Sequence, residues 1–320
     1  MRSADVAGGA LLALGTAVIS GVAVFVSKFG TQAVPDPFVY TTARNLYVGL
    51  LLVGLLLLTR RTGGARPTSR IGRADAGRLA LIALLGGSVP FLLFFWGLSL
   101  TPAPVAGLIQ KTQFLWVALL AGPLLGEALG RWQALALVAL AAGTLLQSPV
   151  AARSPGGGEA LVLAATLLWS VEAVLARRTL RTVHPLTGAA ARMAGGAVVM
   201  LGFLAVSGRL PALAGLSLVQ WGWVAGPGLL LLAYVVTWYH ALRRAPAAAV
   251  TGVLTLGVPV TALLDAVFVT HRWSAGQALG GVLLAAGAAL VTLALWRAVR
   301  ARAPVPAPAA RTEAEYAGAR

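Results

Sequence analysis

Five charged residues lie within long apolar runs of the sequence: Arg44, Lys111, Glu172, Arg192 and Asp265. A charged side chain at bilayer depth costs at least ~2.5–3.5 kcal/mol on insertion scales. Such residues therefore indicate an internal polar cavity, or they neutralise one another. We expect Arg44 and Lys111 to present positive charge to a bound anion, and Asp265 either to neutralise one of them or to reach the membrane interface.

Lys111 has the most distinctive surroundings of the five, since it is one of two lysines among 25 basic residues. Its ammonium is compact and its pKa is easily tuned, unlike that of a guanidinium. Gln110, Thr112 and Gln113 flank it, and four consecutive polar residues cover more than one face of a helix. Some of them must face water or a ligand. The alternative is a lysine that extends to the headgroups or bonds helix-end carbonyls.

Glu172 and Arg192 lie at similar depth in consecutive apolar runs. They form either an ion pair that holds a helical hairpin together, or a gate in which Glu172 carries a proton. Trp169 and Tyr239 are the aromatic residues most expected to line a cavity, because polar residues neighbour them; packing between helices is the alternative. The predicted substrate-binding residues are Arg44, Lys111, Gln113, Trp169, Glu172, Arg192 and Tyr239, and the predicted ion-coupling residues are Glu172 and Asp265.

The composition is that of a membrane protein. Hydrophobic residues make up 58% of the chain and charged residues 11%, against about 25% charged residues in soluble domains. The net charge of +16 does not indicate nucleic-acid binding, because the arginines lie between apolar runs rather than on one face. The chain has no cysteine, which excludes disulfides, thiolate metal sites and cysteine nucleophiles.

The apolar runs approach the ~20 residues that a helix needs to cross a bilayer. They predict an all-α membrane protein of ten transmembrane helices, with the lipid bilayer as its partner. The expected spans lie near 6–28, 38–58, 79–99, 104–124, 132–148, 159–176, 186–207, 218–241, 247–269 and 276–297.

The loops between these spans predict the orientation of the chain. With the N-terminus inside, 18 of the 25 basic residues fall in inner segments, and the outer segments hold Lys28, Arg153, Arg209 and Arg272. Lys and Arg accumulate on the cytoplasmic side of membrane proteins. We therefore expect a multi-pass protein of a bacterial plasma (inner) membrane with both termini in the cytoplasm.

The sequence contains an internal repeat. Pro102 aligns with Pro246 at an offset of 144 residues, and Arg44 aligns with Arg192 at an offset of 148. Helices 1 to 5 thus repeat as helices 6 to 10, and because five is odd, the second half enters the membrane from the opposite face. Inverted repeats of this kind are typical of secondary transporters. The predicted units are residues 1–150, residues 151–300 and a disordered cytoplasmic tail at 301–320.

Three features make the chain resemble the drug/metabolite transporter superfamily, specifically its EamA-type members. They are the plan of five plus five helices, the Leu-Gly-Glu turn within residues 124–133, and a small residue followed by a cation in the first helix of each half, at Ser20 to Lys28 and at Ser170 to Arg178. One departure is that His271 stands where the second half would carry the counterpart of Glu127. This puts a symmetrical role of the acidic turn in doubt.

The resemblance implies export or exchange of amino acids, nucleobases, sugars or drugs, often driven by an ion gradient, through a cavity formed by helices other than the fifth and tenth. We therefore expect a secondary transporter, an exporter of a small organic metabolite such as an amino acid, working by alternating access. The alternatives are a broad-specificity drug efflux carrier and a non-transporting membrane scaffold or enzyme.

Motifs of the common enzyme classes are missing from the sequence. It contains no His-Glu-x-x-His helix or Walker A loop, and no Gly-x-Ser-x-Gly elbow. We expect no enzymatic activity, no cofactor and no metal. The expected partners are a small-molecule substrate and a coupling proton, with no nucleic acid, in a monomer or homodimer.

Overall fold

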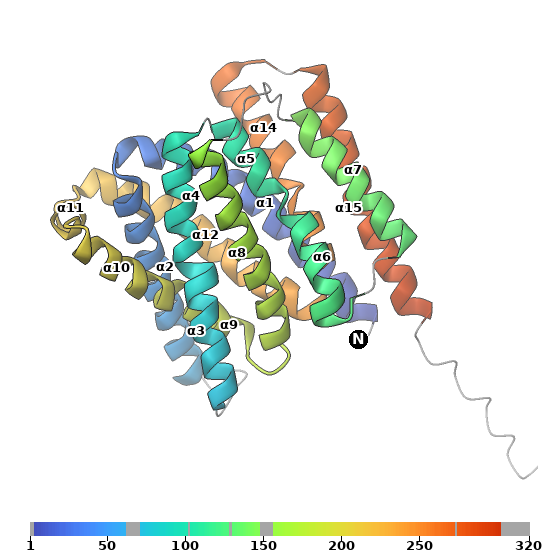
Figure 1. Ribbon diagram of the computed structural model, residues 1–320, viewed down its shortest axis with the longest axis horizontal. Helices are drawn as coiled ribbons and strands as arrows, with labels where there is room; N and C mark the ends of the chain where they lie inside the picture. Colours follow the sequence, from blue (N-terminus) through green and yellow to red (C-terminus); the bar gives the residue numbers. More distant parts are fainter. Residues whose placement is uncertain are drawn as a thin grey trace, which may run out of the picture.

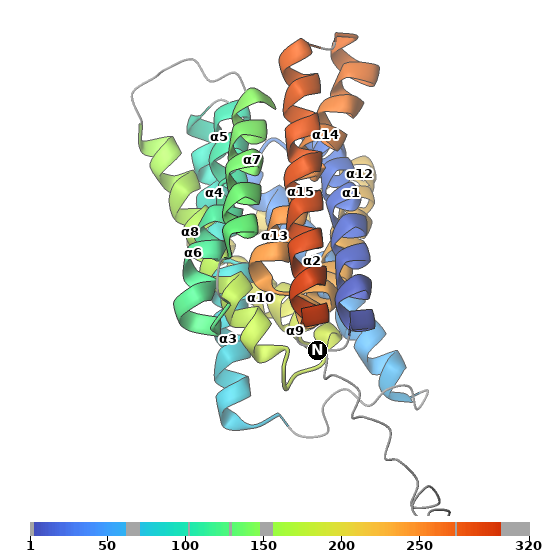
Figure 2. The same ribbon diagram turned by 90° about the vertical axis from the view of Figure 1, so that its right-hand side faces the viewer.

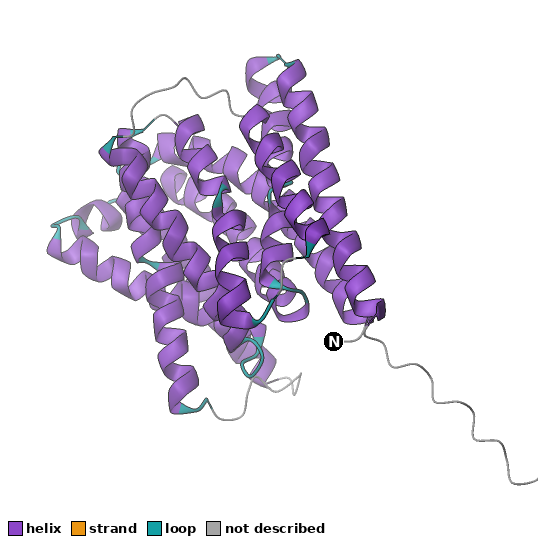
Figure 3. Ribbon diagram, turned by 45° about the vertical axis from the view of Figure 1, so that its right-hand side comes forward, coloured by secondary structure: helices purple, strands orange, loops and turns teal. Residues whose placement is uncertain are grey.

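The structure is a computed structural model that describes residues 3–61, 71–101, 103–127, 130–147, 156–272 and 274–301. Within these ranges the chain forms helices and no strand (Figure 3). The predicted tail at 301–320 lies, apart from its first residue, outside the described residues.

The first half of the chain forms seven helical segments. They are α1 (Ser3–Ala33), α2 (Pro37–Arg61), α3 (Arg73–Gly87), α4 (Val89–Leu100), α5 (Ala103–Lys111), α6 (Gln113–Leu125) and α7 (Arg131–Gln147).

The second half contains six α-helices of eight or more residues and four shorter segments. They are α8 (Gly157–Thr179), α9 (Pro185–Ala190), the π-helical turn η1 (Ala191–Gly195), α10 (Gly196–Val206), α11 (Leu210–Ala214), α12 (Leu218–Arg244), α13 (Ala247–Leu254), α14 (Gly257–Asp265), the π-helical turn η2 (Ala266–Thr270) and α15 (Ala275–Ala301).

Nine helical spans in the described residues are long and apolar enough to cross a membrane, and Arg131–Leu146 forms a shorter apolar helix. This confirms the all-α membrane class predicted from the sequence. The fifth expected span, 132–148, corresponds to this shorter helix, α7, so the count of ten stays a prediction.

Several of the expected spans are interrupted in the structure. The third span breaks at Ser88, between α3 and α4. The fourth tightens at Thr112, whose amide donates to the Ile109 carbonyl at 3.1 Å, and the ninth tightens at Leu256, whose amide donates to the Val253 carbonyl at 3.1 Å. Thr112 and Leu256 are separated by the 144-residue offset of the repeat. The same local geometry therefore recurs at equivalent positions of the two halves.

The helices form one bundle with α7 and α15 packed side by side along its outside (Figures 1 and 2). A Cβ atom on Gly143 of α7 would lie 2.8 Å from the carbonyl oxygen of Gly280 on α15, so a glycine is needed for this close approach. Small residues allow such approach between membrane helices. Within the bundle, α1 packs against α12 and α4 packs against α8.

We refer to the two ends of the bundle as the Arg177 end and the Lys28 end, after one residue at each. The Arg177 end holds the beginning of α1 and the ends of α8, α12 and α15, and the Lys28 end holds the last turns of α1 (Figures 1 and 2). The predicted orientation places the Arg177 end in the cytoplasm.

Candidate functional site

A cavity of about 550 Å³ lies between the two halves of the bundle. Small-molecule sites have volumes of roughly 300–1,000 Å³. Both halves contribute to its wall, and the set of described lining residues contains none from α7 or α15, in line with what the family resemblance implied. The polar and aromatic lining residues include Ser20, Ser27, Lys28, Arg44, Phe91, Phe94, Phe95, Gln110, Lys111, Gln113, Trp169, Glu172, Arg192, Tyr234, Thr251, Thr255, Thr261 and Asp265.

Arg44, from the second turn of α2, lies on the cavity wall among aromatic rings. Its guanidinium carbon is 5.4 Å from the ring centre of Tyr40, 5.9 Å from that of Phe91 and 5.8 Å from that of Phe95. Its Nη1 donates to Ser27 Oγ at 3.3 Å, while its buried Nε has no hydrogen-bond partner in the described structure. Aromatic faces attract a cation without neutralising its charge, so Arg44 retains its capacity to bind an anion.

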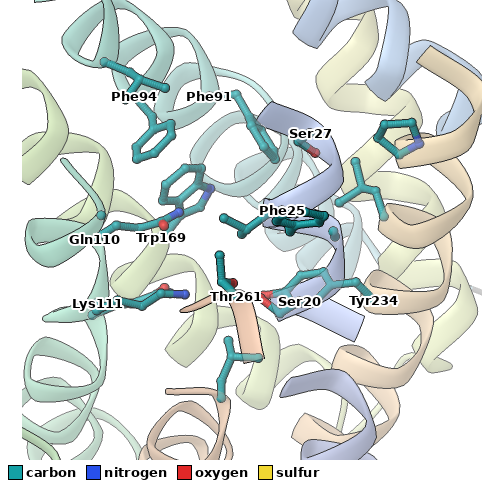
Figure 4. A pocket seen from close by; sticks show the side chains of 18 of the residues that line it. Ser20, Phe25, Ser27, Phe91, Phe94, Gln110, Lys111, Trp169, Tyr234 and Thr261 are labelled. Atoms are coloured by element: carbon teal, nitrogen blue, oxygen red, sulfur yellow. The ribbon is translucent and has the colours of Figure 1, made fainter. Parts of the chain in front are cut away.

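Lys111 is the last residue of α5 and reaches into the cavity beside Gln110 (Figure 4). Ser20, Thr261 and Tyr234 lie on the facing side (Figure 4). Its ammonium forms no hydrogen bond or ion pair with the described residues. The structure therefore places Lys111 in a cavity, as the run of polar neighbours predicted, rather than at the headgroups.

Glu172 and Arg192 approach each other beside two glycines at the end of α3. A Cβ atom on Gly86 would lie 2.5 Å from Glu172 Cγ and 3.1 Å from Arg192 Nε, and a Cβ on Gly87 would overlap the Arg192 carbonyl. Only glycine leaves room here for α8 and η1 to pack against α3. Arg192 also lies in a π-helical turn, a feature that is frequent at functional sites.

The direct ion pair considered for Glu172 and Arg192 is absent from the ion pairs of the described residues. Glu172 Oε1 instead accepts a hydrogen bond of 2.6 Å from the Tyr239 hydroxyl. The Nε and Nη1 atoms of Arg192 are buried and have no hydrogen-bond partner in the described structure. The two side chains therefore lie next to each other without a direct ion pair, and the choice between a structural pair and a gate stays a prediction.

Tyr239 does not line the cavity, contrary to the expectation from the sequence. Its side chain is fully buried, with 0% exposure, and its hydroxyl donates to Glu172 from the side away from the cavity. Tyr234, five residues earlier on α12, lines the wall instead, stacked on Trp238 with ring centres 6.1 Å apart. The other six predicted substrate-binding residues all lie on the cavity wall.

Asp265 lines the cavity but neutralises neither Arg44 nor Lys111, as had been considered. Its Oδ1 pairs with the Nζ of Lys28 at 3.2 Å and so joins α14 to α1. The two side chains are 34% and 48% exposed. The cavity thus reaches the protein surface at the Lys28 end.

Trp169 forms an aromatic cluster at one side of the cavity. Its ring centre lies 5.2 Å from Phe91 and 5.5 Å from Phe94 (Figure 4). Its Nε1 donates to the Gly86 carbonyl at 3.1 Å, in the turn where α3 ends. The indole is thus held by the same helix interruption that positions Glu172.

Sequence reasoning missed part of the wall. Lys28 was counted as a cation of an outer loop. The five phenylalanines and the hydroxyl residues of the wall carried no signal in an apolar sequence. The offset of 144 residues could have identified two of them: Gly107 and Lys111 correspond to Thr251 and Thr255, and all four line the cavity.

A second charged cluster lies outside the cavity, at the Arg177 end. Arg177 Nη1 donates to the Leu242 and Arg243 carbonyls at 2.6 and 2.7 Å, and its Nε lies 3.6 Å from Glu127 Oε1. Glu127 Oε1 also accepts from the Ala247 amide at 3.3 Å. Burial raises the pKa of the Glu127 carboxyl, and the Ala247 amide and Arg177 oppose that shift.

His184 lies beside this cluster, in the connection between α8 and α9. Its Nδ1 accepts from the Leu186 amide at 3.3 Å and caps α9, and its ring lies 6.0 Å from that of His240. Burial lowers the pKa of the His184 imidazole, and His240 and Arg243 add to the shift. Among the described residues, no group of three or more His, Cys, Asp or Glu side chains could hold a metal ion.

Comparisons with known proteins agree with this geometry. A sequence model of one protein family, described as the EamA-like transporter family, matches residues 7–148 and again residues 156–293. A solved structure titled "Crystal structure of protein" matches 93% of this chain and 99% of its own with a TM-score of 0.71. Because the two sequences are 20% identical, this likeness concerns the fold alone. No curated protein matches the chain.

Proposed function

Because the chain belongs to the EamA-like transporter family, we propose that it is a secondary transporter that exports a small organic metabolite, such as an amino acid, by alternating access. The observation that supports this most directly is the cavity between its two halves, which contains cations without anionic partners. The predicted orientation and the family favour a bacterial inner membrane with both termini in the cytoplasm.

The charges on the cavity wall favour a substrate with a carboxylate. Four cationic side chains and two acidic ones line the cavity: Lys28, Arg44, Lys111, Arg192, Glu172 and Asp265. Asp265 is paired with Lys28, and Glu172 accepts from Tyr239. Both acids thus have a partner within the protein, whereas the Lys111 ammonium has none among the described residues. In a low dielectric an uncompensated cation attracts an anion more strongly than in water. We therefore propose that Arg44 and Lys111 bind the carboxylate and that Gln113 adds a polar contact.

A broad cationic-drug exporter is favoured by one observation, the aromatic cluster of Trp169, Phe91 and Phe94. Such a substrate would also need a free acid within reach of that cluster. Glu172 is 1% exposed and bonded to Tyr239, which makes it a weak partner for a bulky cation. The carboxylate substrate is therefore the preferred proposal.

The interrupted helices support alternating access. The breaks at Thr112 and Leu256 flank the cavity at positions related by the repeat, with Lys111 and Thr255 beside them. Transporters with inverted repeats often bind substrate near the midplane at discontinuous helices. Glu172 and Asp265, the acids on the wall, are the proposed sites of coupling to a proton.

The test is flux in vesicles reconstituted with purified protein. Lys111→Ala should abolish saturable flux of the carboxylate substrate while the protein still folds, because the substrate loses its free cationic partner. The matched control is Arg178→Ala, which removes an exposed cation that does not line the cavity and should leave flux unchanged. Unchanged flux in Lys111→Ala would remove this residue from the mechanism.

The substrate itself can be sought by thermal shift, since a ligand that binds the folded state raises its stability by mass action. The screen would compare amino acids, nucleobases and cationic dyes. We expect stabilisation by carboxylates and its loss in Arg44→Gln and Lys111→Ala. Stabilisation by cationic dyes alone would favour the drug exporter, and no saturable flux of any probe would favour a non-transporting scaffold.

A further inference from the structure

The buried Glu127–Arg177 cluster connects three parts of the chain that are far apart in sequence. Arg177 belongs to the last turn of α8, Glu127 follows the end of α6, and the carbonyls of Leu242 and Arg243 lie at the end of α12. The Ala247 amide, bonded to Glu127, opens α13. One pair of side chains thus holds together the helix ends that surround the cavity on this side.

Packed residues lie around this cluster at the same end. Leu180, Val183, Leu242 and Ala245 are 2% exposed or less and belong to the largest core cluster of the described residues. None of them lines the cavity, which reaches the surface at Lys28 and Asp265 instead. The structure is therefore closed at the Arg177 end and open at the Lys28 end.

The repeat does not reproduce this cluster at the open end. At the 144-residue offset, the position of Glu127 is taken by His271. The alignment that pairs Ser170 with Ser20 pairs Arg177 with Ser27. Neither Glu127 nor Arg177 therefore has a charged counterpart in the other half of the chain. Ser27 instead accepts a hydrogen bond from Arg44 on the cavity wall. The described structure at the Lys28 end has a different ion pair, between Lys28 and Asp265, and it is largely exposed.

We propose that Glu127 and Arg177 form a lock that keeps the Arg177 end closed, and that the lack of an equivalent pair at the Lys28 end makes the state open at the Lys28 end the resting state of the empty transporter. This rests on the proposed alternating access. Opening the Arg177 end separates α6 and α8 from the junction of α12 and α13, and therefore breaks the contacts of Arg177 with the Leu242 and Arg243 carbonyls.

The lock can be tested without knowing the substrate, because the chain has no cysteine. A single cysteine placed at Ala23, a small residue of α1 on the cavity wall, reports access to the cavity. The protein is reconstituted in vesicles of known orientation, and a charged, membrane-impermeant maleimide is added at either side. In the Ala23→Cys background we expect rapid labelling from the Lys28 end and slow labelling from the Arg177 end.

Glu127→Gln in this background keeps an oxygen for the Ala247 amide and removes only the charge facing Arg177. We expect labelling from the Arg177 end to rise by about tenfold, the size of a modest population shift, and labelling from the Lys28 end to fall. Arg177→Lys retains the charge but not the planar guanidinium, whose Nε faces Glu127 while its Nη1 bonds both carbonyls, and it should act in the same direction. The control is Asp36→Asn, which breaks the Arg209–Asp36 pair at the other end and should leave the Arg177 end protected.

Unchanged labelling in both folded variants, or an equal rise in Asp36→Asn, would overturn the lock. Flux measurements separate this failure from that of the proposed function. Saturable flux with unchanged labelling would support the proposed transport function and contradict the lock. A change of labelling without flux of any probe would support the lock and count against the proposed substrate.

Discussion

The two ends of the bundle use the same type of ion pair in opposite settings. At the Arg177 end the paired side chains of Arg177 and Glu127 are 9% and 16% exposed, and Arg177 also bonds two carbonyls. At the Lys28 end the side chains of Lys28 and Asp265 are 48% and 34% exposed. Removing one partner of a buried pair is costly, whereas an exposed pair contributes little. Burial, rather than the number of charges, thus distinguishes the closed end from the open one.

The largest expected effect is that of Arg177→Ala. This change leaves the Glu127 carboxylate and two helix-end carbonyls without their partner at a buried site. We expect a loss of ~3–5 kcal/mol in unfolding free energy, the usual cost of breaking a buried pair. Denaturant unfolding in detergent or lipid measures it.

The neighbouring residue provides the control for this variant. Arg178 is exposed in the same turn of α8, and Arg178→Ala should change the unfolding free energy by less than ~0.5 kcal/mol. Equal effects of the two substitutions would contradict the contrast between the ends, because they would show that Arg177 acts through general charge alone.

A smaller effect is expected from pH, through His184 at the Arg177 end. Its folded-state pKa is lowered, so the unfolded chain takes up a proton first as the pH falls below ~6.5. Stability contributed by the neutral, capping imidazole is therefore present above that pH and is lost as the pH falls toward the lowered value. Thermal melts over this range should show the decrease.

His184→Asn isolates this contribution, because an asparagine also accepts from the first amides of a helix and does not titrate. We expect a weaker dependence of melting temperature on pH in this variant. A dependence identical to that of the unsubstituted protein would assign the decrease to other groups.

The smallest effect is expected at the Lys28 end. Asp265→Asn removes an exposed ion pair, which should cost less than ~1 kcal/mol, and the remaining effect should fade as salt is added. Unfolding at low and high salt measures it. A loss as large as that of Arg177→Ala would abolish the difference between the ends.

Much of the fold could be predicted from the sequence, because apolar runs of membrane length and loop charges are one-dimensional signals. The interruptions at Ser88, Thr112 and Leu256 could not, since the residues around them remain apolar and helical in composition. These breaks depend on packing between helices, as at Gly87 against the Arg192 backbone.

The candidate site, too, was predicted in part from the sequence. Charges in apolar runs identified Arg44, Lys111, Glu172 and Arg192 as wall residues, because a charge at bilayer depth needs a polar cavity or a partner. Tyr239 was misplaced by the same logic, since a polar neighbourhood does not indicate on which side of Glu172 a ring lies. The pairing of Arg177 with Glu127 could not be predicted either. In the sequence alone, a buried basic residue near the end of a span looks the same as one that faces water.

The pairing of α7 with α15 leaves one flank of the protein separate from the cavity. Leu135 and Val138 on α7, and Leu279 and Val282 on α15, are exposed on this pair. A spectroscopic label attached there would sense the surrounding lipid rather than bound cargo. The flank is therefore a fixed reference from which movements of the other helices could be measured.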